Sequence, residues 1–246
     1  MKILLVGALG RMGANVIASA AVAGHECVAF VDIGYGDNEN RAQNEYTDIN
    51  EVNGSVDVIV DFSHHSVTEK VVEYAASHHT PVIIATTGHT DAERANIIKA
   101  AERTAVFMSG NMSLGIATMC DTVRRVLSVF PDADVEIVET HHNRKLDAPS
   151  GTALMLFDAV KDVRPDAKAV YGREGKRERD EVGIASVRMG NIVGIHEVMI
   201  GTDSEQITIR HQAFDRALFA DGAVRAAEFI MGKPAGMYDM KDMFRG

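Results

Sequence analysis

The densest run of chemically active side chains lies at residues 139–153, which read ETHHNRKLDAPSGTA. His141, His142, Arg144 and Lys145 fall within five residues there, although the whole chain has a formal net charge of -10. Histidine changes its charge near neutral pH, and lysine can donate a proton or hold a carboxylate. The segment therefore predicts acid–base chemistry beside an anionic group. The alternative interpretation is a solvated basic turn.

A helix start follows this basic run directly. A helical pattern over 150–161 begins at Ser150, just after Pro149, and serine is a favoured N-cap. Gly151, with Thr152 after it, leaves room for an anion to approach the free backbone N–H groups of the first turn. We expect an anion-binding cradle here, and the alternative is an ordinary capped helix.

A metal site is not expected in this segment. Neighbouring side chains on an extended segment point to opposite faces, so His141 and His142 would not easily share one ion. Cys27 and Cys120 are both far from these histidines in the sequence. Two cysteines in 246 residues instead indicate thiols that pack in a reducing compartment.

A second candidate site lies near the N-terminus, where three glycines follow a short apolar run. Their spacing is G-x-x-G-x-x-G, which departs from the commoner G-x-G-x-x-G of dinucleotide-binding loops. Glycine at such positions permits the tight turn and lets a pyrophosphate approach the backbone N–H groups. The alternative is a tight turn that binds nothing. The loop consists of Gly7, Ala8, Leu9, Gly10, Arg11, Met12 and Gly13.

Asp32 strengthens the dinucleotide interpretation. It ends the second expected strand about twenty residues after the glycines, where an acidic side chain bonds the adenine ribose hydroxyls. A carboxylate there repels the extra phosphate of NADP, and Ile33 offers no positive charge to accept it. Arg11 could partly compensate, so we predict NADH as the preferred cofactor, with NADPH usable. The alternative is an aspartate that only terminates a strand.

Strand and helix patterns alternate over the first 110 residues, which predicts βαβ units and a parallel sheet. The expected strands are 3–6, 26–31, 57–62, 81–85 and 105–108, and the expected helices are 11–23, 67–77 and 91–102.

The pattern changes after residue 110 and becomes richer in strands. The expected helices are 118–130, 150–161 and 220–231, and the expected strands are 135–139, 184–189, 196–200 and 205–211. The last three strands have no helices between them, which predicts antiparallel or mixed pairing. The charged stretch 173–183 is expected to be an exposed loop.

Composition limits the partners. Hydrophobic residues make up 46% and charged residues 24%, which is typical of a globular protein with a sizeable core. The acidic balance and the lack of a long basic cluster argue against nucleic acid. Glycines and Arg11 interrupt the first apolar run, so we expect no signal peptide, no membrane contact and a cytosolic location.

Together these motifs resemble those of bacterial dihydrodipicolinate reductases. The run HHxxKxDAPSGTA is similar to that family's signature, and GxxGRMG is similar to its cofactor loop. The runs DFS at 61–63, TTG at 86–88, NMS at 111–113 and GAVR at 222–225 occur in the family's order. The resemblance extends over essentially the whole chain.

The resemblance implies an α/β fold of two domains. A Rossmann-type dinucleotide-binding domain would comprise 1–112 and 217–246, and a mixed-sheet α+β domain at 113–216 would bind substrate and pack a homotetramer. The implied reaction is the reduction of 4-hydroxy-tetrahydrodipicolinate, a small cyclic dicarboxylate, to tetrahydrodipicolinate in diaminopimelate and lysine biosynthesis. Hydride would reach ring C4, and the 4-hydroxyl would leave as water.

The resemblance also implies roles for individual residues. His141 would be the proton donor and acceptor, and Lys145 a proton donor. The substrate carboxylates would be bound by His142, Ser150, Gly151 and Thr152. Cofactor contacts would come from residues 7–12 and from Asp32, Ala85, Thr86, Thr87, Ser109, Gly110, Asn111 and Met112. Two residues depart from the family pattern, because Ala85 replaces a usual glycine and Met112 a usual phenylalanine; both bear on fine cofactor preference.

Two other functions remain open from the sequence. An aldehyde dehydrogenase that forms a thioester needs a nucleophilic cysteine. Cys120 falls on an expected helix among apolar neighbours, which indicates packing instead. A nucleotide sensor without catalysis would use the glycine loop and Asp32 but would not need His141 or Lys145 as acids.

Overall fold

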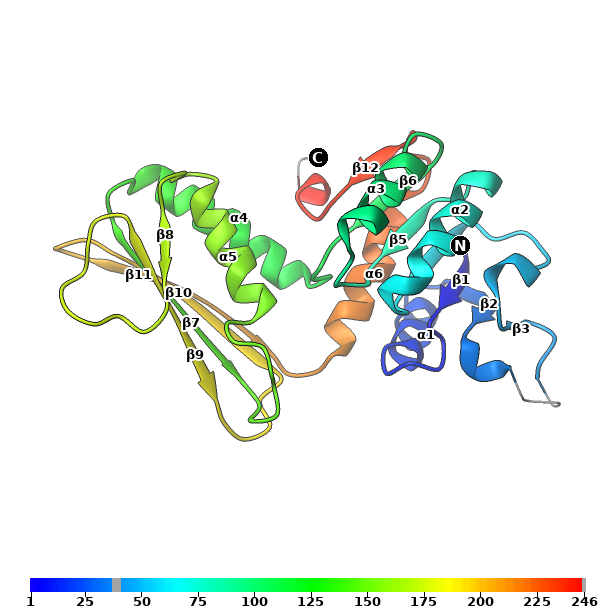
Figure 1. The fold of residues 1–246 in the computed structure, drawn as a ribbon, viewed down its shortest axis with the longest axis horizontal. Helices are drawn as coiled ribbons and strands as arrows, with labels where there is room; N and C mark the ends of the chain where they lie inside the picture. Colours follow the sequence, from blue (N-terminus) through cyan, green and yellow to red (C-terminus); the bar gives the residue numbers. More distant parts are fainter. Residues whose placement is uncertain (37–40, 245–246) are drawn as a thin grey trace. The chain divides into compact units, whose positions relative to one another are not determined.

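The computed structural model describes residues 1–36 and 41–244, which form two compact units (Figure 1). Unit 1 comprises Met1–Ser113 and the chain from Arg216 onward, and unit 2 comprises Leu114–Asp215. These limits differ by one residue from the domain limits expected from the sequence.

Unit 1 is built on a parallel sheet with the strand order β12-β6-β5-β4-β1-β2-β3. The first six strands along the chain therefore lie in the order 3-2-1-4-5-6, which is that of a Rossmann fold. The strands are β1 (Lys2–Val6), β2 (Glu26–Val31), β3 (Glu45–Tyr46), β4 (Val58–Asp61), β5 (Val82–Ile84), β6 (Ala105–Met108) and β12 (Gly236–Tyr238). The prediction of a Rossmann-type parallel sheet is confirmed.

The helices of unit 1 are α1 (Gly13–Val22), α2 (Thr68–His78), α3 (Asp91–Ala100) and α6 (Ala217–Ile230), with short 3-10 turns at η1 (Ile33–Tyr35), η2 (Ile49–Glu51), η3 (His65–Val67) and η4 (Asp242–Phe244). Helix α1 packs beside α6, and α2 packs beside α3. Gly222 lets α6 approach the loop after β6, because a Cβ at Gly222 would stand 1.6 Å from the carbonyl oxygen of Met112. This contact gives the GAVR run a structural role.

Unit 2 is a mixed five-stranded sheet with α4 (Leu114–Val129) and α5 (Gly151–Lys161) packed together on one face (Figure 1). Its strands lie in the order β11-β10-β7-β9-β8. Strand β10 is antiparallel to both β7 and β11, whereas β9 is parallel to β7 and β8. The strands are β7 (Asp134–His141), β8 (Lys168–Val170), β9 (Glu181–Arg188), β10 (Gly194–Gly201) and β11 (Gln206–Ala213). The prediction of mixed pairing is confirmed.

Cys120 lies in the apolar core between the helices and the sheet of unit 2. It is surrounded by side chains such as Met119, Val123 and Leu156 in the same cluster. Its position agrees with the packing role expected from its helix.

Several expected boundaries were wrong. Helix α1 begins at Gly13 rather than residue 11, because the glycine loop turns twice before the helix starts. Helix α4 begins at Leu114, four residues early, and α6 begins at Ala217, three residues early. Strands β3, β8 and β12 were not predicted; each has two or three residues and lies at a sheet edge. Strands this short carry too little alternation to detect.

The charged stretch 173–183 is also more structured than expected. Strand β9 already begins at Glu181. Arg173 bonds Glu136 at 2.7 Å, and Arg177 bonds Asp134 at 2.8 Å, so both arginines are half-buried against β7. The alternating signs of this loop reflect pairing with a neighbouring strand rather than solvation alone.

Within residues 1–36 and 41–244, no helix combines the length and the apolar character needed to cross a bilayer.

Candidate active site

The buried face of β7 changes from apolar to polar at its end. Val135 and Ile137 point into the core of unit 2, and Glu139 and His141 continue the same face because strand side chains alternate. Glu139 is 0% exposed and His141 is 8% exposed. His141 Nδ1 lies 2.6 Å from Glu139 Oε2. The strand therefore holds a histidine and a carboxylate in contact at the edge of the core.

Arg188 compensates the buried charge of Glu139. The strand register pairs Arg188 with His141 across β7 and β9. Its guanidinium donates to both Glu139 oxygens, at 2.7 and 2.8 Å, and the backbone N–H of Ser150 donates to one of them at 3.1 Å. Burial alone would raise the pKa of Glu139, but bonds from Arg188, His141, Ser186 and Ser150 lower it to about 2. Glu139 is thus an anion at neutral pH.

Ser150 connects this pair to the start of α5. Its Oγ caps the helix by accepting from the N–H of Ala153 at 3.2 Å, as the sequence predicts. The same Oγ lies 3.1 Å from Nε2 of His196, which the β7–β10 register places opposite Glu139. Burial, and then the nearby His141, lower the pKa of His196 to about 4. His196 is therefore neutral at pH 7, and its ring stands edge-on to His141 with centroids 5.1 Å apart.

The turn between β7 and α5 carries the predicted lysine. The backbone N–H of Lys145 donates to the carbonyl of His142 at 3.2 Å, and its Nζ lies 2.8 Å from Asp147. Gly151 has open space in front of it, since a Cβ there would meet nothing within 4 Å. His142 lies just past β7 and is half-buried, and its N–H donates to Ile192. The structure thus gathers the signature run around one end of the unit 2 sheet.

Gly194 on β10 lies next to the free face of the His141 ring. A Cβ on Gly194 would stand 3.1 Å from His141 Nε2. That nitrogen is the one that does not contact Glu139, so the absence of a side chain at Gly194 keeps room beside it. The sequence analysis did not single out this glycine.

The glycine loop lies at the topological switch point of the unit 1 sheet. Gly7 follows β1 with a φ of +82°, and a Cβ there would come within 2.8 Å of the Phe62 backbone after β4. A Cβ on Gly13 would come within 1.9 Å of the carbonyl oxygen of Ala8. Both glycines permit close backbone packing, and the strand order reverses between β1 and β4, as in other dinucleotide-binding sheets.

Asp32 bends back toward this loop. Its carboxylate accepts from the backbone N–H of Leu9 at 3.0 Å and from that of Gly34 at 2.9 Å. Asp32 directly follows β2, as the sequence indicates, and its bond to Leu9 was not foreseen. Beside both lies a cavity of about 450 Å³ lined by Val6, Gly7, Gly10, Val31, Asp32, Ile33, Thr47, Asp48, Ile49, Phe62, Ser63, His64, Ser66, Val67 and Lys70.

The remaining predicted cofactor residues follow β5 and β6 at the same carboxyl edge of the sheet. The Thr86 hydroxyl donates to the fully buried Asp61 at 3.1 Å, which fixes the TTG turn after β5. Ser109 Oγ donates to the carbonyl of Asn111 at 2.8 Å and fixes the turn after β6. Met112 is buried. The carboxyl ends of neighbouring parallel strands form the ligand crevice in folds of this kind.

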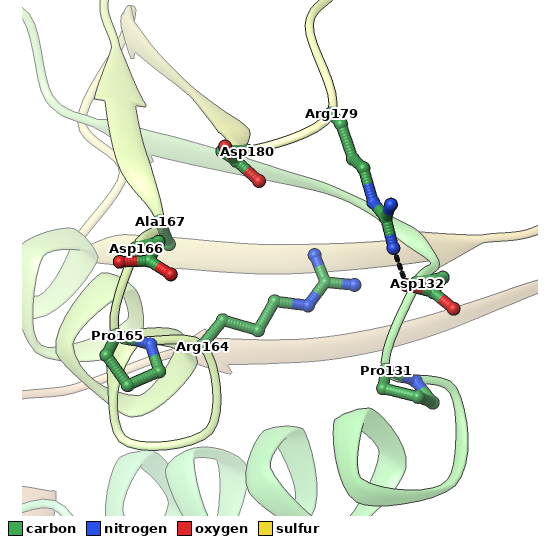
Figure 2. A pocket seen from close by; sticks show the side chains of 8 residues that line it. All are labelled: Pro131, Asp132, Arg164, Pro165, Asp166, Ala167, Arg179 and Asp180. Carbon is green, nitrogen blue, oxygen red and sulfur yellow. Dashed lines mark hydrogen bonds and ion pairs between the residues drawn. The ribbon is translucent and has the colours of Figure 1, made fainter.

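Unit 2 has a hollow of its own, which lies far from His141 along β7. It has a volume of about 390 Å³, and Figure 2 shows Arg164 extending into it while Arg179 pairs with Asp132. Pro131 and Asp132, which line the hollow, lie just before the start of β7, whereas His141 ends it, and a strand of eight residues spans roughly 25 Å. The hollow is therefore separate from the candidate active site.

In the part of the chain that the structure describes, no group of three or more histidine, cysteine or acidic side chains is arranged to hold a metal ion.

Comparison with family models assigns the chain. The model described as "Dihydrodipicolinate reductase, N-terminus" matches residues 1–112, and the one described as "Dihydrodipicolinate reductase, C-terminus" matches residues 115–244. The chain belongs to the dihydrodipicolinate reductase family. The resemblance seen in the motifs is confirmed, and with it the description of the chain as an oxidoreductase of amino-acid biosynthesis.

Individual proteins similar to this chain carry names of the same family. A protein of Caldanaerobacter subterraneus subsp. tengcongensis named 4-hydroxy-tetrahydrodipicolinate reductase is 40% identical, over 100% of this chain and 98% of its own length. One of Alkaliphilus metalliredigens with the same name is 38% identical, over 99% and 98%. The solved structure of a dipicolinate-bound dihydrodipicolinate reductase from Paenisporosarcina sp. TG-14 has the same fold, with a TM-score of 0.83 at 23% identity, covering 99% of both chains.

Four residues of the candidate site were missed by the sequence analysis. Glu139 was quoted in the signature run without a role, and Arg188, Gly194 and His196 lie on strands far along the chain. Only the register of β7, β9 and β10 brings them together. One signal was available in the sequence. Side chains alternate between the two faces of a strand, and Glu139 and His196 are polar residues on the same face as the buried apolar residues of their strands.

Proposed function

We propose that this chain reduces 4-hydroxy-tetrahydrodipicolinate to tetrahydrodipicolinate with NADH or NADPH as reductant. Relatives that carry this name match the chain over nearly its full length. The observation that carries the proposal is the contact between His141 and the buried Glu139 beside the N-terminus of α5. An oriented acid next to an anion-binding helix end suits the reduction of a dicarboxylate.

The substrate carboxylates would bind at the start of α5. The Ser150 hydroxyl, the backbone N–H groups of Gly151 and Thr152, and His142 would hold them, and the open space at Gly151 supports this placement. The Paenisporosarcina relative was solved with dipicolinate, a cyclic dicarboxylate, which supports the class of substrate. Two fixed carboxylates would orient the ring, and orientation supplies a large part of an enzyme's rate.

His141 and Lys145 would manage the proton. Nε2 of His141 is the ring nitrogen that Glu139 does not contact, and the missing side chain at Gly194 leaves space beside it, so the exchanged proton would be held there. Lys145 is paired with Asp147, whose side chain is 59% exposed. A substrate carboxylate could replace this exposed partner, so Lys145 would both attract the substrate and act as a proton donor.

Unit 1 would bind the dinucleotide. The loop from Gly7 to Gly13 would face the pyrophosphate and Asp32 the adenine ribose, and the glycine contacts fit a backbone that must approach phosphate closely. The remaining contacts would come from Ala85, Thr86, Thr87, Ser109, Gly110, Asn111 and Met112. A bound NADH or NADPH supplies the hydride for ring C4. The charge of Asp32 favours NADH.

The division of labour and the assembly follow the family resemblance. Unit 1 would be the dinucleotide-binding domain, and unit 2 would bind substrate and pack a homotetramer in the cytoplasm. Val138, Ile195 and Met199 are half-buried on the face of the unit 2 sheet opposite α4 and α5, which supports packing of that face. A molar mass from light scattering near four times 26.6 kDa would agree with the tetramer.

The direct test is oxidation of NADH and, separately, of NADPH by purified protein with enzymatically generated substrate. Rapid oxidation that depends on substrate is expected, faster with NADH, and His141→Gln should reduce turnover by roughly 10²–10⁴ while NADH binding is kept. Binding of NADH by folded protein with no oxidation of either cofactor would contradict the proposal and favour a nucleotide sensor.

A further inference from the structure

We propose that Glu139, held by Arg188, is a positioning residue that keeps the His141 ring in the tautomer with its proton on Nδ1 and presents Nε2 to the substrate. This inference rests on the proposed function, because it assumes that His141 exchanges the proton of the reaction. It assigns a task to two side chains that the signature run and the family resemblance left without one.

The geometry defines the tautomer. Glu139 Oε2 lies 2.6 Å from His141 Nδ1, and an ionised carboxylate can only accept, so Nδ1 must carry the hydrogen. In the neutral ring Nε2 then bears a lone pair. This nitrogen lies beside Gly194. A methyl group on Gly194 would crowd it, because its carbon would stand only 3.1 Å from Nε2. The proton exchange is therefore assigned to Nε2, the ring nitrogen that Glu139 does not contact.

Arg188 keeps the carboxylate in place and charged. Its Nη1 and Nη2 contact separate oxygens of Glu139, and Nη2 also donates to the carbonyl of Asp147 at 2.6 Å. A two-pronged ion pair fixes the carboxylate plane as well as its position. Because the N–H of Ser150 bonds the same carboxylate, Glu139 also sets the distance between His141 and the cradle at α5.

The charges around His141 fit this role. Glu139 lies on its own strand, Arg188 faces it from β9, and His196 faces it from β10. Lys145 and Asp147 of the following turn act on His196 and Arg188, respectively. Among these groups only Glu139 contacts the protonated nitrogen of the ring, so its negative charge is the one that most directly stabilises the imidazolium.

The proton step balances within this arrangement. Imidazolium His141 carries hydrogens on both nitrogens. When the Nε2–H bond breaks, its electron pair stays on the ring and the proton passes to the substrate, which leaves the neutral Nδ1–H tautomer. Return of a proton from solvent to Nε2 restores the imidazolium. Glu139 keeps its charge throughout, as the acceptor carboxylate does in other histidine dyads.

Glu139→Gln tests the proposal, with Glu136→Gln as the matched control. Glu136 lies on the same strand and is also paired with an arginine, but it points away from His141. In Glu139→Gln the side-chain amide can no longer accept at both oxygens, so it either donates toward Nδ1 or loses its bond with Arg188 or Ser150. We expect kcat to fall by about 10- to 1000-fold, while KM for the substrate changes less than about threefold.

Nitrogen-15 spectra of histidine-labelled protein give a readout that does not depend on activity. In the wild type, neutral His141 should show a protonated Nδ1 and a bare Nε2. In Glu139→Gln the two tautomers should mix or reverse, and the alkaline limb of the kcat profile, where the acid form of His141 is lost, should shift. Glu136→Gln should match the wild type in every respect.

A bare Nδ1 in the wild type would overturn the proposal, as would an unchanged tautomer and pH profile in a folded Glu139→Gln variant. If that variant fails to fold, two other measurements test the proposal: the tautomer of the wild type and the activity of Arg188→Lys. Lysine at this position keeps the positive charge but not the two-pronged contact with Glu139. Arg188→Lys should lower kcat with little change in KM, and wild-type kcat there would overturn the role of Arg188. Inactive wild-type protein with the expected tautomer would instead contradict the proposed function.

Discussion

Gly7, just after β1, lies so close to Phe62, just after β4, that a Cβ on Gly7 would stand 2.8 Å from the carbonyl carbon of Phe62. A residue with a side chain could not approach Phe62 this closely. The φ of Gly7 is +82°, in the left-handed region that glycine favours. Two independent requirements, conformation and space, therefore meet at the residue expected to face the cofactor phosphates.

Gly7→Ala should therefore be more damaging than an alanine at a glycine with the same backbone conformation. Gly24 offers that comparison, because its φ is +77° and a Cβ there would meet nothing within 4 Å. Gly24→Ala should cost about 1–2 kcal/mol of unfolding free energy and leave NADH affinity unchanged. Gly7→Ala should cost more and weaken NADH binding at least tenfold. Equal effects in denaturant titration and cofactor binding would show that the contact with Phe62 is unimportant.

Asp32 should determine the choice between the two cofactors. Asp32→Asn removes a negative charge near the expected position of the ribose while keeping one acceptor oxygen for the backbone. The ratio of kcat/KM for NADH over NADPH should fall about tenfold, which corresponds to ~1.4 kcal/mol. Asp57→Asn is the control, since Asp57 also accepts from a backbone N–H but does not line the cavity. A ratio that both variants leave unchanged would exclude charge repulsion by Asp32.

The parts of the fold that could be predicted were those encoded by local pattern. Apolar runs such as Ile3–Val6 are buried on both faces of a parallel sheet, and Ser150 caps a helix because its side chain reaches the nearby N–H of Ala153. Helix starts were less certain because they depend on more distant contacts. The approach of Gly222 to Met112, for example, joins segments more than one hundred residues apart.

Ser150 should both cap α5 and bind a substrate carboxylate, and Thr90, which only caps a helix, allows the two roles to be distinguished. Thr90 caps α3 through a capping box, so Thr90→Ala and Ser150→Ala each remove one cap and should each cost about 1 kcal/mol of stability. Only Ser150→Ala should weaken dipicolinate binding, because its hydroxyl lies in the expected carboxylate cradle. Calorimetry with dipicolinate distinguishes the two. Identical affinities for both variants would place the ligand elsewhere.

His196 should make the protein sensitive to mild acid. Its pKa is lowered from 6.5 to about 4 by burial, so between these values the unfolded chain binds a proton that the folded chain does not. Stability should thus be complete above pH 6.5 and fall by on the order of 3 kcal/mol as the pH drops to 4. His196→Gln, which keeps a group facing Ser150, should remove much of this slope in denaturant titrations.

His79→Asn is the control for this acid sensitivity, because His79 is exposed and its left-handed backbone suits asparagine. The control should keep the wild-type slope between pH 6.5 and pH 4. A wild-type slope in His196→Gln as well would assign the sensitivity to other groups.

The catalytic segment could be predicted only in part. His141, Lys145 and Ser150 lie within ten residues of one another, so residue type and spacing were enough to single them out. Arg188 and His196 reach the same place through strand pairing, and one residue of slip in that register would move them to the other face of the sheet. Nothing local to either residue specifies that register.

Transfer of deuterium tests the central claim most directly. Purified protein would receive NADH with deuterium at the transferable position, together with freshly generated 4-hydroxy-tetrahydrodipicolinate, and the product would be analysed by mass spectrometry and NMR. The account predicts tetrahydrodipicolinate that carries one deuterium at ring C4, formed by the wild type and much more slowly by His141→Gln. Unlabelled product, label at another carbon, or no product from folded protein that binds NADH would contradict it.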